Sequence, residues 1–182
     1  MKRIVASTIV VLGLIATFPS IHSQEKKQVN PMKAFLLEQL RSTHKTKGTW
    51  FVDTTTAVSG LTPEQASWRD AKGNHSVGQL LYHLAFWNRF TLESLKGDKK
   101  KFTGSNEETF DTFDAKKWDE IQQQFDSVMT ELESLVENAD DVQLEKMAKT
   151  ILNIAAHNAY HTGEIVYVRK EQGSWDPKKG VS

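Results

Sequence analysis

The chain has 182 residues, of which 38% are hydrophobic and 25% are charged. This composition indicates one globular domain with a sizeable core and excludes a disordered or fibrous chain. There is no cysteine, so disulfides and thiolate nucleophiles are excluded, and any metal site must use His, Asp or Glu. Basic and acidic residues balance at 23 each, and we therefore expect no nucleic-acid partner.

Residues 1–23 have the pattern of a secretory signal peptide. The basic start "MKR" precedes the apolar run "IVASTIVVLGLIA", which is short for a membrane span, and then "FPSIHS". We expect cleavage after Ser23 and a single mature domain over residues 24–182. That domain would be exported, either periplasmic or secreted, with no stable membrane insertion after cleavage. An uncleaved anchor is the alternative.

A first helix is predicted from Pro31, a residue favoured in the first helical turn. Residues spaced three and four apart would share its inward face: Leu37, Leu40, His44, Gly48, Phe51, Thr55 and Val58. The β-branched run "VDTTTAV" weakens the helical pattern. A break near Gly48 followed by a short strand is the alternative.

A second helix is predicted between cap residues at 74–76 and a stop at Gly97. The preceding stretch, residues 60–75, is rich in Gly, Pro, Asp and Asn and is predicted to be a loop. The apolar face of this helix contains Val77, Leu80, Leu84, Trp87 and Leu95.

Two further helices follow a linker over residues 98–114. The third is predicted to begin near Asp114, with Trp118, Ile121, Phe125, Val128, Leu132 and Leu135 on one face. The fourth follows "ENADD" and is predicted from about Lys149 to Gln172, with Gly173 as its stop. Four amphipathic helices without a convincing strand pattern predict an all-α fold, a four-helix bundle.

Two histidines four residues apart, His157 and His161, stand in "AAHNAYHTGE". On a helix this spacing lets both imidazoles face one point, as a metal site requires. The zincin motif has a glutamate after its first histidine; here Asn158 stands there, so the zincin interpretation fails. The pair alone is weak evidence, since one buried, hydrogen-bonded histidine and one exposed histidine would give the same pattern.

His83 is the third candidate ligand, because Leu80 and Trp87 flank it at helical spacing and direct it toward the core. Three inward histidines from two helices could meet at one divalent ion and leave one to three coordination positions open.

Two further residues are candidates for catalysis. His44, on the inward face of the first helix, could be a fourth ligand, an acid or base in the pocket, or a core histidine bonded to a carbonyl. Glu164 follows His161 by three residues and could bond the ligand imidazole, bind the metal or act as a base. A solvated surface glutamate is the alternative.

The stretches "HSVGQLLYHLAFWNRFTLESLKG" and "NIAAHNAYHTGEIVYVRKEQGSW" resemble the DinB-like superfamily, also called the DinB/YfiT-like metalloenzymes. The resemblance covers about residues 32–177. It implies an up-down-down-up four-helix bundle, often a homodimer. It also implies one divalent metal ion, usually nickel or zinc, held by His83, His157 and His161.

Some members of this superfamily are thiol-dependent transferases or isomerases. Two features depart from that pattern: the predicted export, and Glu164 where glutamine is more frequent. We therefore expect an exported protein with an open three-histidine metal site, acting on a small molecule as a hydrolase or, second, as a thiol-dependent transferase. A non-catalytic binder of a metal or small ligand is the alternative, and an interaction module whose metal joins the helices is a third.

Overall fold

The computed structural model of the protein describes residues 30–46 and 50–180. The predicted signal peptide and Gly48 lie outside these residues. All regular secondary structure in the described ranges is helical. The elements are α1 (Pro31–His44), α2 (Thr54–Val58), α3 (Pro63–Ser67), α4 (Val77–Leu95), α5 (Glu108–Asp111), η1 (Ala115–Lys117), α6 (Trp118–Asn138), α7 (Asp141–Gln172) and η2 (Pro177–Lys179).

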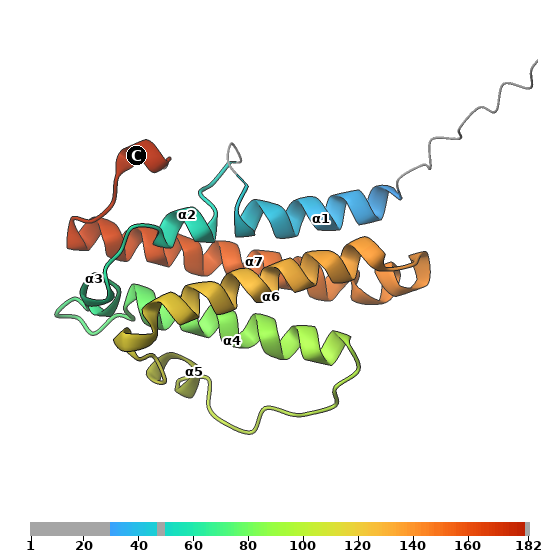
Figure 1. The fold of residues 1–182 in the computed structure, drawn as a ribbon, viewed down its shortest axis with the longest axis horizontal. Helices are drawn as coiled ribbons and strands as arrows, with labels where there is room; N and C mark the ends of the chain where they lie inside the picture. Colours follow the sequence, from blue (N-terminus) through green and yellow to red (C-terminus); the bar gives the residue numbers. More distant parts are fainter. Residues whose placement is uncertain (1–29, 47–49, 181–182) are drawn as a thin grey trace, which may run out of the picture.

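The long helices α1, α4, α6 and α7 pack into a bundle. In it, α1 contacts α6 and α7, and α4 contacts the same two helices. Figure 1 shows α1 and α7 running in one direction and α4 and α6 in the other. In chain order this is the up-down-down-up arrangement, and the all-α prediction is confirmed.

The predicted apolar faces supply most of the core. Fully buried side chains from every long helix meet there: Leu36, Leu40, Leu80, Leu84, Leu92, Trp118, Phe125, Leu132, Leu144 and Ile151. Burying such a side chain stabilises the fold by about 1.5–3 kcal/mol relative to leaving it in water. The bundle is therefore held mainly by the same periodic residues that predicted it.

The predicted first helix is two helices in the structure, so the prediction of one continuous helix was wrong, whereas the alternative predicted the interruption correctly and the strand after it wrongly. The chain leaves the helix after His44 and enters α2 only at Thr54. Asp53 caps α2 by accepting from the backbone N–H of Thr56 at 2.8 Å. No strand occurs between them in the described residues, and Phe51, expected on the inward face, is exposed.

The fourth predicted helix begins earlier than expected, at Asp141 rather than near Lys149. Asp140 and Gln143 form a capping box that satisfies backbone donors at its start. Leu144 is fully buried and adds a turn to the apolar face. The resulting helix is 32 residues long and reaches from one end of the bundle to the other (Figure 1).

Two short helices occupy stretches predicted to be loops. Thr62 and Gln65 form a capping box at the start of α3, within residues 60–75. The linker over 98–114 contains α5, which packs against α4. No helix among the described residues has the length and hydropathy to cross a membrane.

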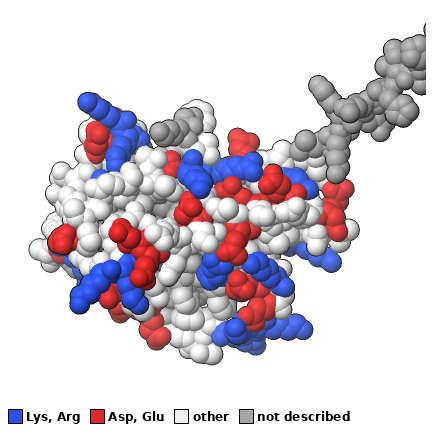
Figure 2. Space-filling view, viewed as in Figure 1, with Lys and Arg blue, Asp and Glu red and all other residues white. Residues whose placement is uncertain are grey.

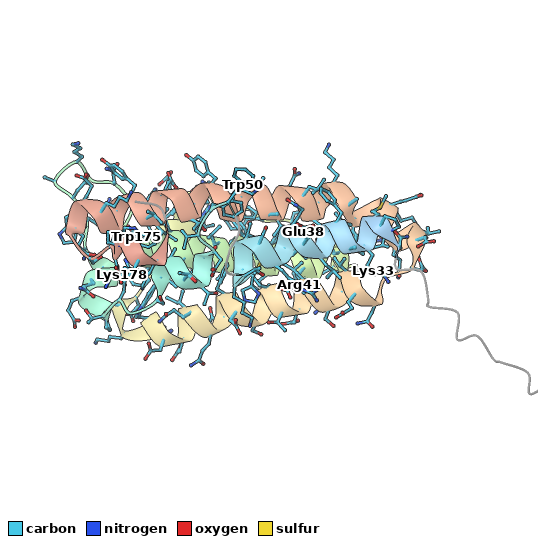
Figure 3. All side chains as sticks on the ribbon, turned by 90° about the horizontal axis from the view of Figure 1, so that it is seen from above. Lys33, Glu38, Arg41, Trp50, Trp175 and Lys178 are labelled. Carbon is cyan, nitrogen blue, oxygen red and sulfur yellow. The ribbon has the colours of Figure 1, made fainter. Side chains whose placement is uncertain are left out.

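Ion pairs link α6 to its neighbours. Arg41 Nε on α1 lies 3.3 Å from Glu133 Oε2, and Arg89 Nη1 on α4 lies 2.8 Å from Glu131 Oε1. Figure 3 shows Lys33 and Arg41 on the side of α1 that faces α6, and Figure 2 shows basic and acidic side chains interspersed on the surface. Exposed pairs of this kind contribute at most about 1 kcal/mol each, so they adjust the helix contacts rather than create them.

Candidate metal centre

Three histidines from α4 and α7 converge on one point. The Nε2 atom of His157 lies 3.2 Å from Nε2 of His83 and 3.0 Å from Nε2 of His161. One ligand atom from each of the three lies within 4.8 Å of the others. His83 and His161 are buried, and His157 is half-buried. The structure thus brings together the three predicted ligands in an arrangement compatible with metal binding.

The spacing of these nitrogens fits a shared metal ion. Imidazole nitrogens bind zinc at about 2.0–2.1 Å. Two such ligands would be about 2.9 Å apart at an octahedral angle and about 3.4 Å apart at a tetrahedral angle. The observed separations of 3.0 and 3.2 Å lie between these limits.

The far side of the His83 ring determines which nitrogen carries its proton. The hydroxyl of Thr109 donates to the backbone oxygen of Asn106 at 2.6 Å, so its oxygen is left to accept from Nδ1 of His83, also at 2.6 Å. The His83 proton therefore sits on Nδ1, and its Nε2 lone pair faces the other histidines. This is the tautomer that a metal ligand needs.

Glu164 has the same effect on His161. Its Oε2 atom lies 2.6 Å from Nδ1 of His161 and accepts that proton, so the lone pair of Nε2 is directed inward. Three roles were predicted for Glu164, and this contact matches the first of them, a hydrogen bond to the imidazole of His161. The carboxylate lies on the opposite side of the ring from the nitrogen that faces the convergence point.

Burial keeps the three imidazoles neutral. It lowers the pKa of His83 to about 3, with smaller contributions from His161 and His157. Burial and the neighbouring His161 lower the pKa of His157 to about 4. The pKa of His161 is also lowered by burial, although Glu164 opposes this shift. Protons therefore do not compete for the ligand nitrogens at neutral pH.

All three histidines line a cavity of about 450 Å³ that is partly open to solvent. Uncharged side chains form its other walls, among them Trp87, Thr91, Asn106, Phe110, Thr150 and Asn153. A larger cavity, of about 540 Å³, lies beside Phe86 and Phe90 and includes none of the histidines. The smaller cavity is therefore the candidate site for a substrate, because the three histidines that could bind a metal line it.

His44 is not part of this group. It is fully buried at the end of α1, with Nδ1 2.7 Å from Glu133 Oε1 and Nε2 2.9 Å from Asp126 Oδ1. Both ring nitrogens thus contact carboxylates of α6, whereas a carbonyl partner was one of the three predicted alternatives. The structure places His44 in the contact between α1 and α6, and neither nitrogen faces the three-histidine group.

The contribution of α5 was not predicted from the sequence. Besides Thr109, this helix supplies Phe110, whose ring stacks on His83 with 3.9 Å between centroids and on His75 at the same separation. Both α5 residues are buried. A four-residue helix has too little periodicity to be predicted, and its contacts with α4 cross 26 residues of chain.

A comparison with known families agrees with the fold and the site. A family model described as the DinB superfamily matches residues 47–165, more than half of the chain, and the matched range includes the three histidines. Searches of curated proteins and of solved structures gave no match. The chain therefore belongs to the DinB superfamily.

Proposed function

We propose that this protein binds one divalent metal ion through His83, His157 and His161, and that it uses the ion to act on a small molecule as a hydrolase or transferase. The observation that carries the proposal is the convergence of three Nε2 atoms at separations of 3.0 and 3.2 Å. Thr109 accepts a hydrogen bond from Nδ1 of His83, and Glu164 accepts one from Nδ1 of His161. Nickel and zinc, the ions expected from the family, both accept imidazole ligands.

Three histidines leave coordination positions for other molecules. Among the described residues, no fourth His, Asp or Glu side chain joins the three histidines at the convergence point. Catalytic metal sites commonly have three protein ligands and an open position, whereas structural sites are closed by four. The open side faces the cavity of about 450 Å³, which has room for a small substrate.

When bound, a divalent cation with three neutral ligands would act as a Lewis acid toward a molecule in the cavity. The residues of the chain have separate tasks. The three imidazoles would hold the ion, and Trp87 and Phe110 provide apolar surface in the cavity beside it. Glu164 accepts the hydrogen bond from Nδ1 of His161 and is itself partly exposed. We therefore propose that it orients the His161 imidazole and does not contact the substrate.

Metal analysis of the purified protein tests the site. We expect one equivalent of nickel or zinc per chain, and a large loss of bound metal in His83→Ala, His157→Ala and His161→Ala. His75→Ala is the matched control, because His75 stacks on Phe110 without belonging to the group. Unchanged metal content in all three ligand variants would overturn the assignment.

A second experiment separates an enzyme from a metal-binding protein without catalysis. Metal-loaded protein would be incubated with small esters, amides and phosphoesters, and with thiols plus electrophiles. We expect turnover of one class, lost on chelation and regained when the metal is restored. Full metal occupancy without any turnover would favour the non-catalytic alternative.

We also propose that the chain is exported and forms a homodimer. The pattern of residues 1–23 supports export, and the family resemblance supports the dimer. Mass spectrometry of the mature protein should give an N-terminus near Gln24, and light scattering should give twice the mass of the mature chain. An intact Met1 in the mature protein, or a monomer at micromolar concentration, would contradict the respective proposal.

A further inference from the structure

The described residues that line the cavity beside the three histidines include no charged side chain. Its polar groups are amides and hydroxyls, including Thr91, Asn106, Thr150 and Asn153. Among the described residues, Glu164 is the carboxylate that contacts one of the three histidines, and it lines a different cavity together with His75 and Tyr167. The side of the site that faces a substrate is therefore uncharged before a metal binds.

A divalent ion in this site would retain a positive charge. Three neutral imidazoles do not offset its two charges, and the carboxylate of Glu164 offsets only one, from behind the His161 ring. The cavity walls beside the ion include Trp87, Phe110 and Ile154, which screen charge poorly. The remaining positive charge would attract an anion to the open coordination positions.

The walls also limit the charge of that anion. A dianion such as a phosphate monoester needs more than one positive partner, and proteins usually supply Arg, Lys or backbone N–H groups for this purpose. In the part of the chain that the structure describes, neither Arg nor Lys lines the cavity. A carboxylate has one negative charge and two oxygens, which match a single ion with open positions.

We propose that the metal site takes a small monoanionic carboxylate, with its charged group at the open positions of the ion. The uncharged remainder would lie against Trp87 and Phe110, and polar atoms on it would meet the amides of Asn106 and Asn153. This inference rests on the proposed metal site and adds the class of molecule that the site selects.

The test uses cobalt(II)-loaded protein, whose visible absorption reports ligands that enter the coordination sphere. Acetate, its neutral isostere acetamide, and inorganic phosphate would be titrated at constant ionic strength. We expect acetate to change the spectrum and to bind at least about tenfold more tightly than either of the other two. Acetamide or phosphate binding as tightly as acetate would overturn the inference.

Charged substitutions at Asn153 provide a second test, because a negative and a positive side chain should change acetate affinity in opposite directions. Asn153 is exposed at the rim of the cavity on α7, so both substitutions leave the core intact. We expect Asn153→Asp to weaken acetate binding and Asn153→Lys to strengthen it, each on the order of fivefold. Gln123→Glu and Gln123→Lys, on an exposed position of α6, are the matched controls and should change little.

The metal proposal and this inference fail in distinguishable ways. Cobalt content would be measured in the same samples. Protein without bound cobalt would overturn the metal site and, with it, the inference. Protein with one cobalt per chain, but with acetate affinity that does not respond to the two Asn153 variants, would overturn the anion inference alone.

Discussion

This bundle contains two groups of side chains built around buried histidines, and the hydrogen-bond partners of the histidines differ between them. In the candidate metal centre, His83 and His161 donate from Nδ1 to Thr109 and Glu164, and the Nε2 atom of each faces Nε2 of His157. The second group consists of His44, Asp126 and Glu133, and in it both ring nitrogens of His44 contact carboxylates. Ionised carboxylates only accept hydrogen bonds, so each ring nitrogen of His44 faces an acceptor.

This difference shows what makes a buried histidine available to a metal. Burial alone does not do so, since His44 is as deeply buried as His83. The groups around the ring decide: one acceptor at Nδ1 leaves Nε2 free for a metal, whereas two carboxylates occupy both nitrogens. We therefore assign metal binding to the first group and a structural role in joining α1 to α6 to the second.

The largest expected effect is a loss of folding stability when His44, in the second group, is replaced. His44→Ala should lower the free energy of unfolding by about 2–4 kcal/mol, because it removes a buried donor from two carboxylates and leaves a cavity. Denaturant unfolding would measure this, and the metal content should not change. Arg41→Ala, which removes an exposed partner of Glu133, is the control and should cost at most about 1 kcal/mol. Loss of metal in His44→Ala, with the fold intact, would break the distinction between the groups.

At the metal centre, Thr109→Val should weaken metal affinity by about 10- to 100-fold, because the valine keeps the shape but cannot hold Nδ1 of His83. Competition with a chelator of known affinity would measure the change. Thr112→Val is the matched control, since Thr112 is exposed and its hydroxyl bonds only to the backbone of α5. Equal affinity in both variants would show that Thr109 does not position the ligand.

Metal-free protein should lose stability as the pH falls below 6.5. The pKa values of His83 and His157 are about 3 and about 4 in the folded chain, below the ordinary value of 6.5. Between these values the unfolded chain binds protons that the folded chain does not, so stability is fully present above pH 6.5 and decreases toward pH 4.

Thermal unfolding at several pH values would measure this slope. His83→Ala should reduce it, because the variant removes the most strongly shifted group. The carboxylates near His44, Asp126 and Glu133, have lowered pKa values and contribute only at lower pH. Stability of the metal-free protein that is constant from pH 7 to pH 4.5 would contradict the neutral state of the site.

Glu164→Gln should have the smallest effect, a loss of metal affinity of less than about tenfold. The amide oxygen of glutamine can still accept from Nδ1 of His161, although without the negative charge. Glu164→Leu should have a larger effect, because it removes the acceptor altogether. Chelator competition on the two variants would rank them, and equal losses would show that charge rather than the hydrogen bond is what matters.

The sequence predicted the parts of the fold that depend on local periodicity. Residues such as Leu84, Phe125 and Ile151 recur at helical spacing, and all are buried. The three candidate ligands were predicted from patterns of the same kind, because His157 and His161 are four residues apart and apolar residues flank His83 at helical spacing. The early start of α7 could also have been predicted, since Asp140 and Gln143 have the spacing of a capping box.

The partners of the histidines could not be predicted in this way. Thr109 reaches His83 across 26 residues, and the carboxylates of Asp126 and Glu133 reach His44 across 82 and 89 residues. No local pattern encodes such distances. The sequence therefore indicated which histidines face inward, but the packing of α5 and α6 decides which of them can bind a metal.

The most direct test of this account is anomalous diffraction from crystals of the protein loaded with zinc or nickel, measured at the absorption edge of the metal. We predict one peak per chain, within about 2.0–2.2 Å of Nε2 of His83, His157 and His161, with its remaining positions facing the cavity. A peak bonded to His44 or to the carboxylate of Glu164, or no peak at the three histidines in metal-loaded protein, would contradict it.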